Sequence, residues 1–432
     1  MTTVGLGSRP AVTRTGHFTR DTMACGTPSL LSQRAMLNEK QAELAHHALD
    51  GFAIELPSWG FANTGTRFGK FIQASAATNT EEKLADAGVV HRFTGCCPSV
   101  AVHVLWDFPD GLADVPAVLR SAAAQGVRIG AINPNVFQDQ RYKNGSLGNP
   151  DPEIRRQALA HILDCIEIQR ATGSRDLSLW FADGLSYPGT GSIRARKDWF
   201  IEGLQTVHAA LSGNQRMLVE YKPFEPAFYA TDIADWGMSY IYCKHCGPRA
   251  TVLVDTGHHY QAQNIEQIVA WLLSEGMLGG FHFNDRRYAD DDLTLGCLDP
   301  YQVFRIFHEI RSFAWETGTE PDIPYVVDQS HNLKNKIEET LQTAANAQEL
   351  FLKAVLVDHE RLAFYQARGD LVDAEECLRA AFFTDVRPVM REWRKAKGLA
   401  EDPLLAFRES GYLQAAEKAR GEKNRGAISS YA

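Results

Sequence analysis

The fold of this chain is indicated most clearly by residues 251–258, which read TVLVDTGH. The first four residues form a short apolar and β-branched run, which is typical of a buried strand. An aspartate follows at once, and a histidine follows three residues later. In barrels of parallel strands, side chains at the carboxyl end of each strand converge on one pocket. This stretch therefore predicts a strand that ends in a site.

Seven similar runs lie on either side of it, separated by longer stretches of helical periodicity. Strands are expected at residues 52–59, 100–106, 127–132, 177–181, 217–221, 251–254, 280–283 and 325–327. Helices are expected at 151–172, 193–211, 265–275 and 301–316, with a closing helix from about Leu333. Eight strands with helical connections predict an α/β fold, a (β/α)8 TIM barrel. An open doubly wound sheet is the alternative, but no glycine-rich phosphate turn follows the first strand.

This pattern divides the chain into three parts. Residues 1–49 are expected to form a leader and a helix, partly disordered because the first thirty residues lack periodicity. Residues 50–356 contain the strand pattern and should form the barrel. Residues 357–432 are charged and helical, for example at 370–397 and 403–420, with no further strand pattern. We expect this C-terminal helical extension to make contacts within an oligomer.

The composition is that of a globular protein, with 44% hydrophobic residues. The net charge of −9 comes from 53 acids and 44 bases without a Lys/Arg cluster, which disfavours nucleic acid as a partner. We find no apolar run of the roughly 18 residues that a membrane span needs, and no signal-peptide core. A cytoplasmic protein is expected. Its eight scattered cysteines suit reduced thiols, and Cys243 with Cys246 is better explained by free thiols on a helix than by half a zinc site.

Metal-binding side chains stand at the ends of four consecutive predicted strands, 5 to 8. These ends read Glu220-Tyr221-Lys222, Asp255-Thr256-Gly257-His258, His282-Phe283-Asn284-Asp285 and Asp328-Gln329-Ser330-His331-Asn332. A single acid at a strand end is often a helix cap, but carboxylates that point into one volume repel unless cations neutralise them. Glu220, Asp255, His282 and Asp328 could form one oxygen-rich site with a single imidazole. Such a site suits Mn²⁺ or Mg²⁺, and Co²⁺ is also compatible with it.

A second metal ion is predicted beside the first. His258 lies three residues after Asp255, so Asp255 could bridge the two ions while His258 binds the second. The loop after strand seven contains Asp290-Asp291-Asp292, whose alternate members, Asp290 and Asp292, could turn toward the same ion. A solvated acidic loop is the alternative for these three acids.

The expected pocket also contains a lysine and several aromatic rings. Lys222 lies two positions after Glu220, so both side chains should face inward, where an ammonium group could neutralise an oxygen that gains negative charge. The alternative for Lys222 is a structural ion pair with a pocket carboxylate. Aromatic residues of the early strands could stack on a sugar, although aromatics in strands are more often core. These are Trp59, Phe68, His103, Trp106, Phe137, Trp180 and Phe181. His103 is a candidate for opening the sugar ring by proton transfer, or a core histidine.

Six segments of the sequence resemble L-rhamnose isomerases of the Pseudomonas type, which are relatives of xylose isomerase. They are LPSWGFANTGTRF (56–68), SLWFADG (178–184), EYKPFEPAFYATDIADWG (220–237), LVDTGHH (253–259), GGFHFNDRRYADDDL (279–293) and VVDQSHN (326–332). The likeness runs from about residue 50 to the C-terminus. The leading segment and the stretch 137–149 depart from the family pattern.

This resemblance implies a metal-dependent isomerase that moves a hydride between C1 and C2 of an open-chain sugar, as a homotetramer with two Mn²⁺ or Co²⁺ ions. It implies a structural site of Glu220, Asp255, His282 and Asp328, and a catalytic site of Asp255, His258, Asp290 and Asp292. The substrate-facing residues would be Trp59, Phe68, His103, Trp180 and Lys222. L-Rhamnose is the expected substrate, with D-allose as a second aldose. We take Lys222, His103 and Asp328 as candidate catalytic residues, with Asp328 as the base if a proton is transferred.

Three other functions are compatible with parts of this pattern. A ketose 3-epimerase shares the barrel and a Glu, Asp and His metal set, but it needs a pair of carboxylate bases on opposite faces of the sugar. A Schiff-base aldolase would use Lys222 as a neutral nucleophile, which is unfavourable beside cations. A non-catalytic sugar-binding protein would have no need of His258 and the Asp290 and Asp292 loop.

Overall fold

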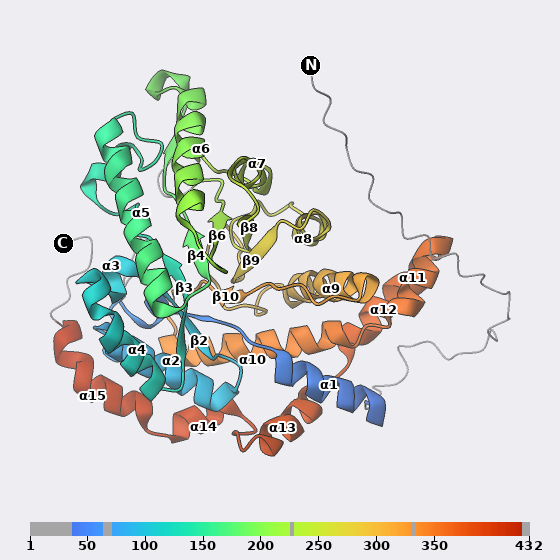
Figure 1. The fold of residues 1–432 in the computed structure, drawn as a ribbon. Coiled ribbons are helices and arrows are strands. Elements are labelled where there is room, and N and C mark those ends of the chain that lie inside the picture. The colour runs from blue at the N-terminus through green and yellow to red at the C-terminus, as the bar shows by residue number, and fades with distance from the viewer. Residues whose placement is uncertain (1–36, 64–70, 225–228, 331–332, 426–432) are drawn as a thin grey trace.

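The computed structural model describes residues 37–63, 71–224, 229–330 and 333–425 (Figure 1). Eight parallel strands form one sheet in the order β1-β2-β3-β4-β6-β8-β9-β10. Their bounds are Leu56–Pro57, Ser99–His103, Arg128–Asn133, Asp176–Leu179, Arg216–Glu220, Ala250–Asp255, Leu278–Phe283 and Tyr325–Val327. The predicted (β/α)8 TIM barrel is confirmed.

The barrel is closed between its first and last strands by Glu55. This residue forms a parallel bridge with Val326, in which Glu55 N–H donates to Tyr325 O at 2.7 Å and Val327 N–H donates to Glu55 O at 2.9 Å. Strand β1 is nevertheless much shorter than the predicted run 52–59. Beyond Pro57, residues Ser58–Phe61 turn into the 3₁₀ helix η2.

Two other differences concern short elements. The predicted strand 100–106 ends at His103, and Val104–Asp107 forms the short helix α3. Strands β5 (Gly184–Leu185) and β7 (Ala230–Thr231) form a small antiparallel pair that was not predicted. Elements of two residues are too short to produce a periodic pattern in the sequence.

Helices surround the barrel and connect its strands (Figure 1). They are α2 (Thr80–Thr94), α4 (Val115–Ala124), α5 (Pro152–Thr172), α6 (Ile193–Ala210), α7 (Trp236–Cys246), α8 (Ile265–Ser274), α9 (Pro300–Thr317) and α10 (Lys336–Val355). Several begin at a side chain that accepts a backbone N–H, such as Asp151, Ser192 and Asn264. The seven cysteines within the described residues are free thiols, with Cys243 and Cys246 on α7. Among these helices and the others described, none is long and apolar enough to cross a membrane.

The described residues after Val355 contain five helices, α11 (His359–Arg368), α12 (Leu371–Phe383), α13 (Arg387–Ala396), α14 (Pro403–Glu409) and α15 (Tyr412–Arg425). Helices α13 and α14 run beneath α10, and α13 meets the N-terminal helix α1 (Glu39–Gly51) (Figure 1). Trp393 of α13 donates its Nε1–H to Asp50 of α1 at 2.8 Å. As predicted, the described residues after the last barrel strand form helices and no further strand.

The last helix holds the segment that connects β1 to α2. Arg420 donates two hydrogen bonds to the buried carboxylate of Asp86, at 2.7 and 3.0 Å, and one to Ser75 O at 2.8 Å. Asn424 Nδ2 lies 2.9 Å from both Ala74 O and Ala76 O. The described end of the chain therefore completes a part of the fold that begins more than 300 residues earlier, since Arg420 and Asp86 are 334 positions apart.

Candidate metal centre

A cavity of about 100 Å³ opens at the carboxyl ends of the barrel strands. The alternation of side chains along each strand decides what faces it. On β9, the rings of Phe281 and Phe283 are fully buried in the apolar core, while His282 between them lies at the cavity. Predicted site residues that line the cavity are Trp59, His103, Trp180, Glu220, Lys222, His258, His282, Asp290, Asp292 and Asp328. Phe68, which was also predicted, lies outside the described residues.

The first predicted ligand set is brought together by four strands. Ligand atoms of Glu220, Asp255, His282 and Asp328 all lie within 4.8 Å of one another. His282 Nδ1 is 3.3 Å from a Glu220 oxygen, 3.6 Å from an Asp328 oxygen and 4.0 Å from Asp255 Oδ2. Three carboxylates and one imidazole form a set of hard donors suited to Mn²⁺ or Mg²⁺.

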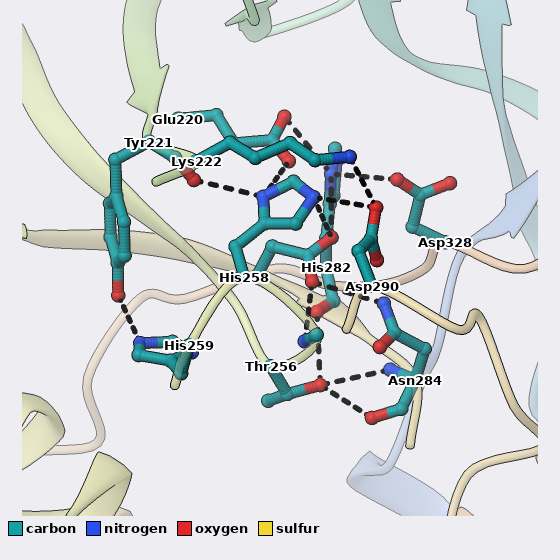
Figure 2. A network of polar contacts seen from close by, with 12 residues as sticks. Glu220, Tyr221, Lys222, Thr256, His258, His259, His282, Asn284, Asp290 and Asp328 are labelled. Atoms are coloured by element: carbon teal, nitrogen blue, oxygen red, sulfur yellow. Dashed lines mark hydrogen bonds and ion pairs between the residues drawn. The ribbon is translucent and has the colours of Figure 1, made fainter. Parts of the chain in front are cut away.

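A second group shares Asp255 with the first and adds His258 and Asp290. His258 Nε2 lies 3.2 Å from Asp290 Oδ2 and 3.8 Å from Asp255 Oδ2 (Figure 2). Its Nδ1 lies 2.8 Å from the backbone carbonyl of Tyr221, which can only accept a hydrogen bond. Nδ1 therefore carries a proton, and Nε2 faces the acids as the potential metal ligand.

The three acids of the loop after β9 differ in their roles. Asp290 and Asp292 line the cavity. Asp291 between them accepts backbone N–H groups of its own loop, including that of Tyr288 at 2.7 Å. Asp292 has a φ of 50°, a left-handed conformation that aspartate tolerates better than most residues. The loop thus presents alternate acids to the cavity, although Asp292 is not part of the compact second group.

Lys222 reaches across the cavity wall to the acidic loop. Its Nζ donates to Asp290 Oδ2 at 2.5 Å and lies 5.7 Å from the centre of the Trp180 ring. The ion pair that was weighed as an alternative is therefore present, and the same ammonium group borders the cavity. Glu220, two positions before Lys222, also faces the cavity. Tyr221 lies between these two residues and points away, and its hydroxyl contacts His259 Nε2 at 2.6 Å.

The charges of the two groups strongly perturb their pKa values. Burial alone would lower the pKa of His258, but the carboxylates of Asp255 and Asp290 outweigh it and raise that pKa to about 9. Burial would also lower the pKa of His282, but the carboxylate of Glu220 outweighs it and raises that pKa to about 9. Burial raises the pKa of Asp255 to about 7. The buried carboxylates therefore need positive charge close by, which a divalent cation would supply.

Several buried atoms of this cluster fit the same interpretation. Asp255 Oδ2 and both ring nitrogens of His282 make no hydrogen bond to any described residue. Buried polar atoms are normally hydrogen-bonded, so such atoms need another partner. They face one another across the first group of ligands. The residues present fit a pair of divalent cations that share Asp255.

Aromatic rings form the opposite wall of the cavity. His103 is the centre of this wall, with ring centroids 4.8 Å from Trp59, 4.3 Å from Trp106 and 5.6 Å from Phe137. The ring centroids of Phe137 and Trp180 lie 5.0 Å apart, so the aromatic wall extends to Trp180. Burial lowers the pKa of His103 to about 3, so this imidazole is neutral near pH 7. Its Nδ1 is buried without a hydrogen bond to a described residue, which leaves it available to a ligand of the cavity.

Sequence reasoning gave no role to several polar residues of the site. Asn133, Ser178 and Ser330 line the cavity, and Asn284 contacts Asp255. Ser178 lies two positions before Trp180, so the alternation of the predicted strand 177–181 could have indicated it. Asn284 lies two positions after His282 and could have been found in the same way.

A family described as the xylose isomerase-like TIM barrel matches residues 99–342, which is more than half of the chain. The chain belongs to this family. Within it, a probable sugar isomerase of Rhizobium meliloti (strain 1021) is 38% identical over 366 residues, which cover 84% of each chain. A probable sugar isomerase of Mesorhizobium japonicum is also 38% identical, over 84% of this chain and 85% of that protein. A xylose isomerase of Thermus thermophilus is 25% identical over 66% of this chain and 74% of its own length.

Solved structures agree with the family at the level of the fold. A D-allulose 3-epimerase from a Methylomonas species has a TM-score of 0.51 at 14% identity, covering 71% of this chain and 98% of that chain. A xylose isomerase domain protein from Alicyclobacillus acidocaldarius has the same TM-score and identity, covering 70% and 99%. At this identity the likeness concerns the barrel alone.

Proposed function

We propose that this protein is a metal-dependent sugar isomerase that interconverts L-rhamnose and L-rhamnulose. D-Allose and D-psicose are a second pair that we expect it to interconvert. The observation that carries the proposal is the pair of ligand groups that share Asp255, beside a cavity with an aromatic wall and a lysine. The names of the relatives as sugar isomerases and xylose isomerases support the reaction class. The choice of L-rhamnose rests on the six sequence segments quoted above.

Two divalent ions are the proposed cofactors, most suitably Mn²⁺, with Co²⁺ or Mg²⁺ as substitutes. Glu220, Asp255, His282 and Asp328 would hold one ion, and Asp255, His258, Asp290 and Asp292 the other. When bound, two such ions supply Lewis acidity to neighbouring oxygens of a substrate, such as those on C1 and C2 of a sugar.

The side chains of the pocket would orient the open-chain sugar and stabilise its charge. Trp59, His103 and Trp180 offer ring faces that exclude water and pack on the apolar face of a sugar. The ammonium group of Lys222 would stay protonated and stabilise negative charge that develops on a sugar oxygen. The neutral imidazole of His103 could accept the hydroxyl proton that must leave when the sugar ring opens.

A ketose 3-epimerase is the second candidate. A metal set of Glu220, Asp255, His282 and Asp328 would serve such an enzyme too, and epimerases share this barrel. The second group with His258 and Asp290, together with Lys222, favours the isomerase, since an epimerase needs two bases on opposite faces of the sugar.

We propose that the protein is cytoplasmic and forms a homotetramer. The C-terminal helices expose large apolar side chains, including Phe364, Leu371, Val372 and Phe383, which would be covered in an oligomer. We propose that the C-terminal extension of 357–432 contributes to assembly, next to the barrel of 50–356 and the N-terminal part of 1–49.

The reaction can be tested by incubating the protein with Mn²⁺ and a panel of aldoses in D₂O and following the products by NMR. We expect L-rhamnulose to form fastest. The hydrogen on C2 of the aldose should appear on C1 of the ketose without exchange, because it shifts within the sugar. Substantial deuterium on C1 at early times would contradict the hydride shift and favour Asp328 as a proton-transferring base. Exchange at C3 of a ketose, without aldose turnover, would favour the epimerase.

The two ligand groups should respond differently to substitution. We expect His258→Asn to reduce kcat strongly while the melting temperature and sugar binding stay near those of the parent, because His258 belongs only to the smaller group. Glu220→Gln should also lower the melting temperature in Mn²⁺, since metal binding at the larger group is coupled to folding. Thermal melts and steady-state kinetics of both variants provide the comparison. An equal loss of melting temperature would refute the assignment of two distinct sites.

A further inference from the structure

The carboxylate of Asp255, which belongs to both ligand groups, is held by the protein on one side only. Its Oδ1 accepts hydrogen bonds from Gly257 N–H at 2.6 Å and from Asn284 Nδ2 at 3.0 Å. Its Oδ2 is buried, makes no hydrogen bond to the described residues, and lies 3.8 Å from His258 Nε2 and 4.0 Å from His282 Nδ1. One oxygen is thus occupied by donors, and the other is turned toward both imidazoles.

The backbone of Asn284 is held by two hydrogen bonds with the Thr256 hydroxyl. Its backbone N–H donates to the Thr256 hydroxyl at 2.9 Å, and that hydroxyl donates to the Asn284 carbonyl at 2.6 Å. The side chain is 1% exposed. Gly257 lies beside this amide, and an added Cβ there would stand only 2.4 Å from Asn284 Oδ1. The amide fits its place because residue 257 has no side chain.

We propose that Asn284 is a positioning residue that orients the shared carboxylate of Asp255 so that Oδ2 is presented to both metal sites. The proposal rests on the metal centre proposed above. Without the Nδ2 donor, the carboxylate keeps only the Gly257 N–H and can rotate about its Cβ–Cγ bond, so that neither oxygen is fixed between the two histidines. Partners that orient metal ligands in this way commonly affect metal affinity by about 10- to 100-fold.

A purely structural role for the side chain would predict a different outcome. The connection between the β8 loop and the end of β9 is already made by the backbone of Asn284 and the Thr256 hydroxyl. The hydrogen bond of the side chain goes instead to Asp255. Its removal should therefore change metal affinity more than it changes the stability of the metal-free fold.

The test is Mn²⁺ binding to the full-length chain after EDTA dialysis, measured by the EPR signal of free Mn²⁺, for the parent and for Asn284→Leu. We expect both proteins to be folded, with the weaker of two Mn²⁺ sites losing about 10- to 100-fold in affinity in the variant. The weaker site should be the one of His258 and Asp290, because its compact group contains three ligands instead of four and Asp292 lies outside that group. Asn346→Leu is the control, since Asn346 Nδ2 donates to Leu295 O at 2.8 Å and lies 3.4 Å from Cys297 Sγ, away from the cavity.

Gly257→Ala provides a second measurement, because its methyl group would stand 2.4 Å from Asn284 Oδ1 and 2.7 Å from Asp290 Oδ1 and would displace the amide together with one proposed ligand. Folded Asn284→Leu or Gly257→Ala protein with both Mn²⁺ constants within threefold of the parent would overturn the proposal. So would a drop of equal size in Asn346→Leu. If the parent turned over none of the sugars, the proposed substrate would fail, but the Mn²⁺ comparison would remain valid because it does not depend on turnover.

Discussion

Dialysis against excess EDTA should abolish aldose turnover, and Mn²⁺ or Co²⁺ should restore it. The expected loss is about 10³-fold or more in kcat/KM, because stabilisation of a charged transition state is the largest single contribution to many enzymes. Chelation would also leave the carboxylates of Glu220, Asp255 and Asp328 without a divalent cation, balanced only in part by the neighbouring histidines, so the melting temperature should fall with activity. Initial rates with L-rhamnose, measured against added metal, give the comparison.

The control is the same dialysed protein supplied with Ca²⁺, which prefers a larger and more flexible set of ligands than these two groups offer. We expect Ca²⁺ to restore part of the melting temperature and little of the turnover. Full turnover in excess EDTA after long incubation would disprove a metal-dependent mechanism.

Substitution of Lys222 by methionine should have the second largest effect. Methionine keeps most of the length of the side chain and removes the charge, so we expect kcat to fall by about 10²- to 10³-fold, as on removal of one preorganised donor to a developing oxyanion. The Nζ also neutralises Asp290 at 2.5 Å. Mn²⁺ affinity should therefore be unchanged or increased in Lys222→Met, which separates a loss of catalysis from a loss of metal.

Lys353→Met is the matched control, since Lys353 forms an ion pair with Glu349 on α10, outside the cavity. It should retain the kcat of the parent. A kcat of Lys222→Met within threefold of the parent would remove Lys222 from the mechanism. Covalent trapping of substrate on Lys222 by borohydride would instead favour the Schiff-base aldolase.

Much of this site could be predicted because strand alternation and barrel geometry act locally. Phe281 and Phe283 face the core, so His282 must face the cavity, and the same logic brings Glu220 and Lys222 inward together. The carboxyl ends of parallel strands meet at one end of a barrel, which brings distant acids within reach of one another.

What could not be predicted depends on contacts between distant segments. Strand alternation can place Asn284 on the same side as His282, but its bond to Asp255 joins residues 29 positions apart, and nothing in the local pattern indicates that partner. The shortness of β1 has a similar cause. A run of apolar residues predicts burial, but Ser58–Phe61 buries its side chains as a 3₁₀ helix rather than as a strand.

The bonds from Arg420 to Asp86, and from Glu55 to the last strand, have a consequence for synthesis on the ribosome. Bacterial and eukaryotic ribosomes add about 5 to 20 residues per second, so the 334 residues between Asp86 and Arg420 take roughly 20 to 70 seconds to produce. Until then the Asp86 carboxylate lacks its guanidinium partner, and until Tyr325 emerges the first strand has one unpaired edge. An open strand edge can pair with another chain. The nascent protein must therefore keep its first strand apart from its neighbours for most of the time that it is being made.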